Sequence, residues 1–399
     1  IMKQAILIST GLLLITPFIH AEKNKDKKPN VVFILADDLG YGDLSCYGQE
    51  KFETPNIDKL AQSGMRFTQC YSGTTVSAPS RSCLLTGTHS GHTPVRGNLE
   101  LDPEGQFPLP DDARTIFEVM KDAGYKTSAF GKWGLGYIGS TGDPKNQGCD
   151  TFYGYNCQRE AHTYYPPFLY RNEHREYLNN PLVVPHTKLD KGADPYEEKS
   201  YAKYTLNEYA PDLMYKEILN FIDLTKDNPF VLFWTTPLPH VPLQAPEKWV
   251  KHYVNKFGDE KPYTGNKDYF PCRYPRATYA AMMSYWDEQI GGLINKLKEL
   301  GIYDNTIIIF TSDNGPTFNG GSDSFFFDSA KPFKSEWGWG KASLREGGIR
   351  VPMIASWPKK IKAGSKSDLI CAFWDIMPTF CEIAKVECPT TDGISFLPE

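Results

Sequence analysis

The chain has 399 residues, of which 23% are charged, and a formal net charge of −5. This length allows up to about three domains, and the composition is that of an ordinary soluble globular protein. A small negative charge gives no reason to expect a surface that binds polyanions, so nucleic acid is excluded as a leading partner.

The N-terminal residues 1–21 are predicted to be a secretory signal. Lys3 precedes a short apolar run, and the small residue Ala21 follows it, which is the order of a signal peptide. The run is too short to span a bilayer comfortably, which disfavours the alternative of a membrane anchor. Residues 22–29 are expected to be a solvated linker. We therefore expect a periplasmic or secreted protein without a membrane span after signal removal.

Cysteine usage says little about function. Nine cysteines are an odd number, so an exported chain leaves at least one thiol free or paired outside the chain. Their spacing shows no paired Cys-x-x-Cys pattern, which disfavours a zinc ribbon.

Three continuous apolar runs predict strands buried on both faces of a sheet: residues 30–36, 230–234 and 306–310. Helical patterns lie at residues 55–64, 113–124, 209–226 and 274–301. This alternation predicts an α/β sandwich with a mostly parallel sheet between helices. Residues 140–205 and 240–275 lack periodicity and are predicted to be long loops that select the substrate.

Two polar pairs directly follow predicted strands: Asp37-Asp38 and Asp313-Asn314. Ligands of open α/β sheets bind outside the carboxyl ends of the strands, so we expect these pairs to share one site. Three carboxylates and an amide oxygen suit calcium or magnesium better than zinc. The alternative is that each pair only caps the following segment, but two pairs at matching strand ends favour a metal site.

A second candidate site is Ser77-Ala78-Pro79-Ser80-Arg81. It places a small nucleophile before a helix started by proline, with the positive end of the helix dipole toward Ser77. Arg81 lies one helical turn later and can point back toward Ser77. The alternative is an ordinary serine N-cap.

Taken together, the motifs resemble those of the type I sulfatases in order and spacing from residue 30 to residue 398. The matching segments are Asp37–Asp43, Thr54–Ala61, Ser77–Gly87, Gly131–Trp133, Pro239-His240, Thr311–Gly315, Gly340-Lys341 and Glu346–Pro352. The resemblance implies the alkaline-phosphatase-like α/β fold, hydrolysis of sulfate esters and one calcium ion. It also implies that Ser77 is oxidised to formylglycine, and the serine form suggests an anaerobic, radical-type maturation enzyme.

The resemblance also implies roles for individual residues. A hydrated aldehyde at residue 77 offers two hydroxyls, one to attack sulfur and one to expel sulfate later. Arg81 would hold this hydrate, Lys132 and Lys341 would spread the charge of the transferred group, and His240 would protonate the leaving alcohol. The expected metal ligands are Asp37, Asp38, Ser77, Asp313 and Asn314.

The sequence departs from the family pattern at Gly134, where the family usually has a histidine that contacts formylglycine. The segment around Arg159 and His162 resembles that of a bacterial subgroup of carbohydrate sulfatases that also lacks this histidine. We therefore expect His162 to replace it or to bind sulfate, and Arg159 to face the sugar. The alternative is that both are ordinary loop residues.

The resemblance divides the chain into a catalytic domain at residues 30–385 and, at 386–399, the start of a truncated antiparallel subdomain. The expected substrates are glycans carrying sulfated galactose or N-acetylgalactosamine. Two alternatives remain: a phosphatase or phosphodiesterase of the same superfamily with two zinc ions, and a glycan-binding remnant without turnover.

Overall fold

The structure is a computed structural model that describes residues 27–102 and 105–397. The predicted signal peptide and most of the predicted linker lie outside the described residues. No helix in the described part is long and apolar enough to cross a membrane.

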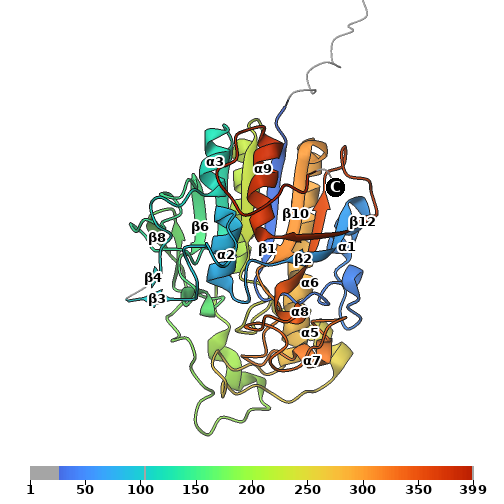
Figure 1. Cartoon of the computed structure of the whole chain (residues 1–399). Coiled ribbons are helices and arrows are strands. Elements are labelled where there is room, and N and C mark those ends of the chain that lie inside the picture. The colour runs from blue at the N-terminus through green and yellow to red at the C-terminus, as the bar shows by residue number, and fades with distance from the viewer. Residues whose placement is uncertain (1–26, 103–104, 398–399) are drawn as a thin grey trace, which may run out of the picture.

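A ten-stranded mixed sheet forms the centre of the molecule, in the order β12-β2-β11-β10-β1-β9-β5-β6-β7-β8 (Figure 1). Its middle strands β10, β1, β9, β5 and β6 run parallel, which confirms the predicted α/β sandwich. The strands are β1 Asn30–Ala36, β2 Met65–Tyr71, β5 Lys126–Lys132, β6 Thr151–Tyr155, β7 Phe168–Arg171, β8 His174–Tyr177, β9 Phe230–Thr235, β10 Thr306–Ser312, β11 Arg350–Ser356 and β12 Ser365–Ala372, and a separate hairpin pairs β3 Glu100–Leu101 with β4 Gly105–Gln106.

Helices cover both faces of the sheet. One face packs against α2 Ser77–Thr86, α3 Ile116–Asp122 and α9 Ile376–Ala384, which lie in front in Figure 1. The other packs against α1 Pro55–Ser63, α4 Ala210–Thr225 and α6 Pro275–Glu299. Alternate side chains of β1 therefore enter two cores, Phe33 on the first face and Ile34 on the second. Burial on both faces explains the continuous apolar run.

The predicted strands and helices are confirmed, but the two predicted long loops are partly wrong. Residues 140–205 contain β6, β7 and β8, and residues 240–275 contain α5 Glu247–Phe257. Val250, Val254 and Phe257 recur at helical spacing and pack against the α6 side of the core, an amphipathic pattern hidden among lysines and asparagine. The short helices α7 Ser324–Phe327 and α8 Glu346–Ile349 flank the loop that carries Lys341.

The start of α2 also differs from the prediction. The helix begins at Ser77 itself, with Val76 as the preceding cap, so Ser77 lies in the first turn and Pro79 follows two residues later. All ten residues of α2 are buried.

None of the nine cysteines, all within the described residues, forms a disulfide. Most of them are buried among apolar side chains, where cysteine behaves as a small hydrophobe.

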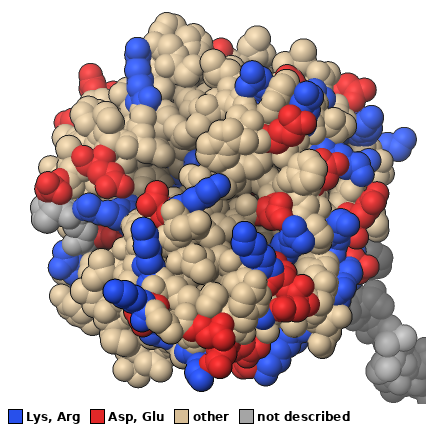
Figure 2. Space-filling model, turned by 90° about the horizontal axis from the view of Figure 1, so that it is seen from below, with Lys and Arg blue, Asp and Glu red and all other residues tan. Residues whose placement is uncertain are grey.

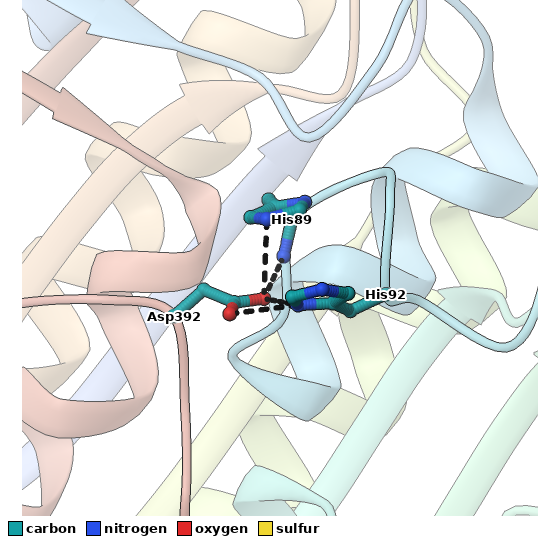
Figure 3. A group of neighbouring side chains, drawn as sticks. All are labelled: His89, His92 and Asp392. Atoms are coloured by element: carbon teal, nitrogen blue, oxygen red, sulfur yellow. Dashed lines mark hydrogen bonds and ion pairs between the residues drawn. The ribbon is translucent and has the colours of Figure 1, made fainter.

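The last described residues lie against the body of the protein. Phe396 is buried and packs edge-on against Phe67 of β2, with ring centroids 5.7 Å apart. Asp392 accepts hydrogen bonds from the backbone N–H of His89 and from the His92 ring, each at 2.9 Å (Figure 3). These contacts attach residues 386–397 to β2 and to the loop that follows α2.

Candidate functional site

Four neighbouring parallel strands end at one edge of the sheet, at the lower end of Figure 1, and deliver most of the predicted residues there. Asp37 and Asp38 follow β1, and Asp313 and Asn314 follow β10. The last residue of β5 is Lys132, and the loop after β9 carries His240. The Asp37 N–H donates to the carbonyl of Leu238 at 3.0 Å, which ties the β1 end to the His240 loop.

Helix α2 adds Ser77 and Arg81 to this edge. The Ser77 hydroxyl donates to Asp37 Oδ1 at 3.1 Å. The Arg81 guanidinium donates to Asp313 Oδ2 at 3.0 Å and to the backbone carbonyl of Lys132 at 2.6 Å. The predicted one-turn spacing therefore places Ser77 and Arg81 in the same buried polar cluster.

The N-terminus of α2 is held by a residue that sequence reasoning missed. The N–H of Ala78 donates to the side-chain oxygen of Asn98 at 2.8 Å, which satisfies one of the unpaired donors of the first turn. No local pattern around Asn98 indicates this contact, because the two residues meet only through the fold.

Both predicted lysines reach the aspartates. Lys132 Nζ lies 2.5 Å from Asp37 Oδ2, and Lys341 Nζ lies 2.7 Å from Asp38 Oδ1. The Lys341 loop is pinned on two sides, because the Lys341 N–H donates to the carbonyl of Pro316 at 2.9 Å and the next N–H donates to that of Thr75 at 3.0 Å.

Three carboxylates thus face three cationic side chains in a buried space. The carboxylates are those of Asp37, Asp38 and Asp313, and the cations are Arg81, Lys132 and Lys341. Burial alone would raise the pKa of Asp37, but Lys132, His240 and Arg81 hold it well below its usual range. Burial and the charge of Asp37 raise the pKa of Asp313 to about 6. The cluster is formally neutral when the three carboxylates are ionised, and one divalent cation would give it an excess of positive charge.

The donor set fits a hard cation. Asn314 Oδ1 is buried without a hydrogen-bond partner in the described structure, whereas its Nδ2 donates to Asp38 Oδ1 at 2.7 Å. Ligand atoms of Asp37, Asp38 and His240 lie within 4.8 Å of one another. An orphaned buried amide oxygen beside three carboxylates is a suitable arrangement for calcium.

A second group with metal-ligand residues, His89, His92 and Asp392, is accounted for by hydrogen bonds (Figure 3). His89 Nδ1 accepts the N–H of Gly91 at 2.9 Å. The neutral ring therefore carries its hydrogen on Nε2, which faces Asp392 at 3.9 Å and offers no lone pair to a metal.

His240 lies over the aspartates with its ring orientation fixed. Its Nδ1 donates to the Val241 carbonyl at 2.5 Å, and its Nε2 lies 3.5 Å from Asp38 Oδ2. Burial lowers the pKa of His240 to about 4. The neutral ring therefore presents a lone pair at Nε2, and it must first gain a proton to act as the expected acid.

The structure brings His162 into the site, whereas Arg159 lies at its margin. The His162 ring stacks on His240, with centroids 5.7 Å apart and planes 8° apart. Arg159 is partly exposed and lies 3.6 Å from Glu100. Two residues that the sequence did not suggest, His186 and Tyr269, surround His162, with ring centroids 5.0 and 4.9 Å away.

Gly134, where the family pattern expects histidine, lies directly under a glutamine that sequence reasoning also missed. Gly134 has φ of 77°, and a Cβ there would lie 2.1 Å from Gln158 Nε2. A side chain at position 134 is therefore incompatible with the observed position of Gln158.

Figure 2 shows the face at this end of the sheet, where basic and acidic side chains are interspersed and neither sign dominates. The cationic side chains Arg81 and Lys132 of the site lie below the surface, where they are 2% and 1% exposed. Such an arrangement suits one small anionic group better than an extended polyanion.

Comparison with known proteins shows the family of the chain. A family model described as Sulfatase matches residues 29–386. N-acetylgalactosamine-6-sulfatase of Homo sapiens is 29% identical over 390 residues, which cover 93% of this chain and 65% of the human protein. N-acetylglucosamine-6-O-sulfatase of Bacteroides thetaiotaomicron is 28% identical over 454 residues, covering 99% of this chain and 75% of that protein. The chain thus spans slightly less than two thirds of the length of the human relative.

Among solved structures, the crystal structure of Ps i-CgsB in complex with k-i-k-neocarrahexaose is similar with a TM-score of 0.75 and 29% identity. The match covers 93% of this chain and 76% of that one.

Proposed function

Because the chain belongs to the sulfatase family, we propose that it hydrolyses sulfate esters of carbohydrates, with residue 77 as nucleophile after oxidation of its serine to formylglycine. The observation that carries the proposal is the position of Ser77. Its hydroxyl is buried against Asp37, on a cluster that also contains Arg81 and Lys132.

The proposed metal ligands are Asp37, Asp38, residue 77, Asp313 and Asn314. Calcium, when bound, would neutralise sulfate oxygens and lower the pKa of a hydroxyl at residue 77. The unpaired oxygen of Asn314 supports this assignment. The three carboxylates, and an asparagine in place of a histidine directly after Asp313 in the sequence, also disfavour the alternative phosphatase with two zinc ions.

The cationic side chains would hold the transferred group. Lys132 comes from the end of β5 and Lys341 from the loop before α8, and each forms an ion pair with one of the two adjacent aspartates. Donors fixed before the reaction stabilise developing negative charge without reorganisation. Arg81 is held by Asp313 and a backbone carbonyl, and we assign it to orienting residue 77.

His240 is proposed to exchange a proton with the leaving oxygen. Its Nδ1 is committed to the Val241 carbonyl, which leaves Nε2 as the atom that faces the site. Proton transfer requires that one nitrogen be free and correctly directed.

Carbohydrate esters are the proposed substrates because the relatives include enzymes named for N-acetylgalactosamine and N-acetylglucosamine sulfates and a structure solved with a neocarrahexaose. We favour glycans with sulfated galactose or N-acetylgalactosamine. Trp337 in the Lys341 loop is 74% exposed and stands beside Phe318, and exposed aromatic rings suit sugar faces. We further propose maturation by an anaerobic-type formylglycine-generating enzyme and a periplasmic or secreted location.

The test has two stages. Mass spectrometry of the peptide containing residue 77, from protein produced with and without a maturation enzyme, is expected to show loss of two hydrogens only in the matured sample. Matured protein, S77A and unmatured protein are then assayed on a panel of sulfated monosaccharides. Sulfate release by matured protein alone supports the proposal. Equal release by S77A, or phosphate-ester hydrolysis that depends on zinc, would contradict it.

A further inference from the structure

A short hydrogen-bond relay leads from the backbone of Tyr269 through His186 to His162. The Tyr269 N–H donates to His186 Nδ1 at 3.1 Å. The other nitrogen of this ring, His186 Nε2, lies 3.0 Å from His162 Nδ1. The relay joins two segments far apart in sequence, the loop after β8 and the loop after α5.

The relay determines where the hydrogens are. A backbone N–H can only donate, so His186 Nδ1 must be the acceptor, and the neutral ring carries its hydrogen on Nε2. That hydrogen points at His162 Nδ1, which is then an acceptor too. Neutral His162 is left with its hydrogen on Nε2, on the ring edge away from His186.

Several observations place the His162 ring beside the proposed sulfate site. The His162 ring lies parallel to His240, with centroids 5.7 Å apart. Burial and the charges of His240, Lys132 and Lys341 lower the pKa of His162, which keeps the ring neutral. Among the described residues, no hydrogen-bond acceptor for His162 Nε2 is found, so the donor is available to a ligand.

The backbone that presents the relay is held in an unusual conformation. His186 and Tyr269 have φ of 65° and 63°, and Asp268 has φ of 60°. Residues other than glycine seldom adopt these angles, and such strain concentrates at functional sites.

We propose that His186 is a positioning residue that holds His162 as the Nε2–H tautomer, so that His162 donates a hydrogen bond to a sulfate oxygen and does not act as a base. This inference rests on the proposed function for its biological meaning. The donor then belongs to the ring that is stacked on His240. A neutral histidine donor strengthens its bond where the acceptor carries charge.

The first experiment needs no turnover and uses unmatured, full-length protein with isotope-labelled histidine. Long-range proton–nitrogen correlation spectra at pH 8 report which ring nitrogen carries hydrogen, and the His162 signals are identified by their loss in H162N. We expect hydrogen on Nε2 alone, and a shift of that signal when inorganic sulfate is added. Hydrogen on Nδ1 of wild-type His162, or no response to sulfate, would overturn the inference.

The second experiment compares two replacements of His186 that are isosteric with each other. In H186Q the side-chain amide can still donate to His162 Nδ1, whereas in H186E the carboxylate accepts and draws the hydrogen to Nδ1. For matured enzyme with N-acetylgalactosamine 6-sulfate as probe, we expect H186Q to retain kcat/KM within roughly threefold and H186E to lose roughly 10- to 100-fold. Equal kcat/KM for the two variants overturns the positioning role. If the wild type releases no sulfate, the proposed function fails, while the spectra still decide the tautomer.

Discussion

The side chain of Gln158 occupies the space above Gly134, with its Nε2 2.1 Å from where a Cβ on that glycine would stand. The backbone N–H of Gln158 is itself held by the Gln106 side chain at 3.0 Å. Gln158 Nε2 is buried without a partner in the described structure. The Gln158 amide in this position and a side chain at position 134 therefore exclude each other.

This pairing predicts strong coupling between the two positions. G134A is expected to destabilise the protein by at least about 1–2 kcal/mol, because alanine is strained at positive φ and its methyl group collides with Gln158. In G134A/Q158A the collision is removed and only the strain remains, so a double-mutant cycle should show about 1 kcal/mol of coupling. Urea unfolding of the four proteins provides the measurement, and additive effects would contradict the contact.

Loss of the Lys341 charge should reduce catalysis. K341M keeps most of the side-chain volume but removes the ion pair of Asp38 with Lys341, whose Nζ lies 2.7 Å from Asp38 Oδ1. We expect kcat/KM of the matured enzyme to fall by roughly 100- to 1000-fold, the size of effect seen when one charge-stabilising donor is removed. K334M in the same loop is the matched control, because Lys334 lies over the Trp339 ring. Comparable losses of kcat/KM in K341M and K334M would mean that disturbance of the loop, and not loss of the Lys341 charge, lowers activity.

Calcium should stabilise the protein through Asn314. A cation that binds only the folded state raises the free energy of unfolding by about 2.7 kcal/mol at a concentration of 100 times Kd. We expect calcium to raise Tm and a chelator to reverse the shift. N314A removes the unpaired oxygen and should reduce the shift strongly, whereas N319A, at an exposed position after the same strand, should leave it unchanged. An undiminished calcium shift in N314A would count against the assigned ligand.

Asp43 should make stability depend on pH. Burial raises the pKa of Asp43 to about 7, although Tyr279 and the N–H of Gly40 donate to its carboxylate. The folded state therefore retains a proton that the unfolded state loses near pH 4. The contribution of Asp43 to the free energy of unfolding is complete below that pH. It is lost as pH rises to about 7, with a slope of up to about 1.4 kcal/mol per pH unit.

D43N cannot titrate at this position, so the wild type should lose stability relative to D43N as pH rises from 4.5 to 7. Urea unfolding across this range measures the difference. D304N, a surface substitution, serves as the control for general charge effects. A constant difference between the wild type and D43N would show that Asp43 keeps an ordinary pKa.

The sequence was sufficient to predict the residues at strand ends but not those in the loops. Asp37 and Asp313 could be placed together because parallel strands end at one edge of a sheet, and the structure confirms that their side chains lie in one cluster with Arg81. His186 and Tyr269 could not be foreseen, because their approach to His162 depends on the paths of two aperiodic segments.

Ser77 is only 1% exposed, and if it is oxidised as proposed, this burial has a consequence for the order of events during synthesis. Its helix follows β2, which pairs with β12 near the end of the described chain. The ribosome must add roughly 300 further residues, in about 15–60 s, before that pairing can form. An enzyme that oxidises Ser77 therefore has a limited period in which to reach it, and slower elongation should increase the modified fraction.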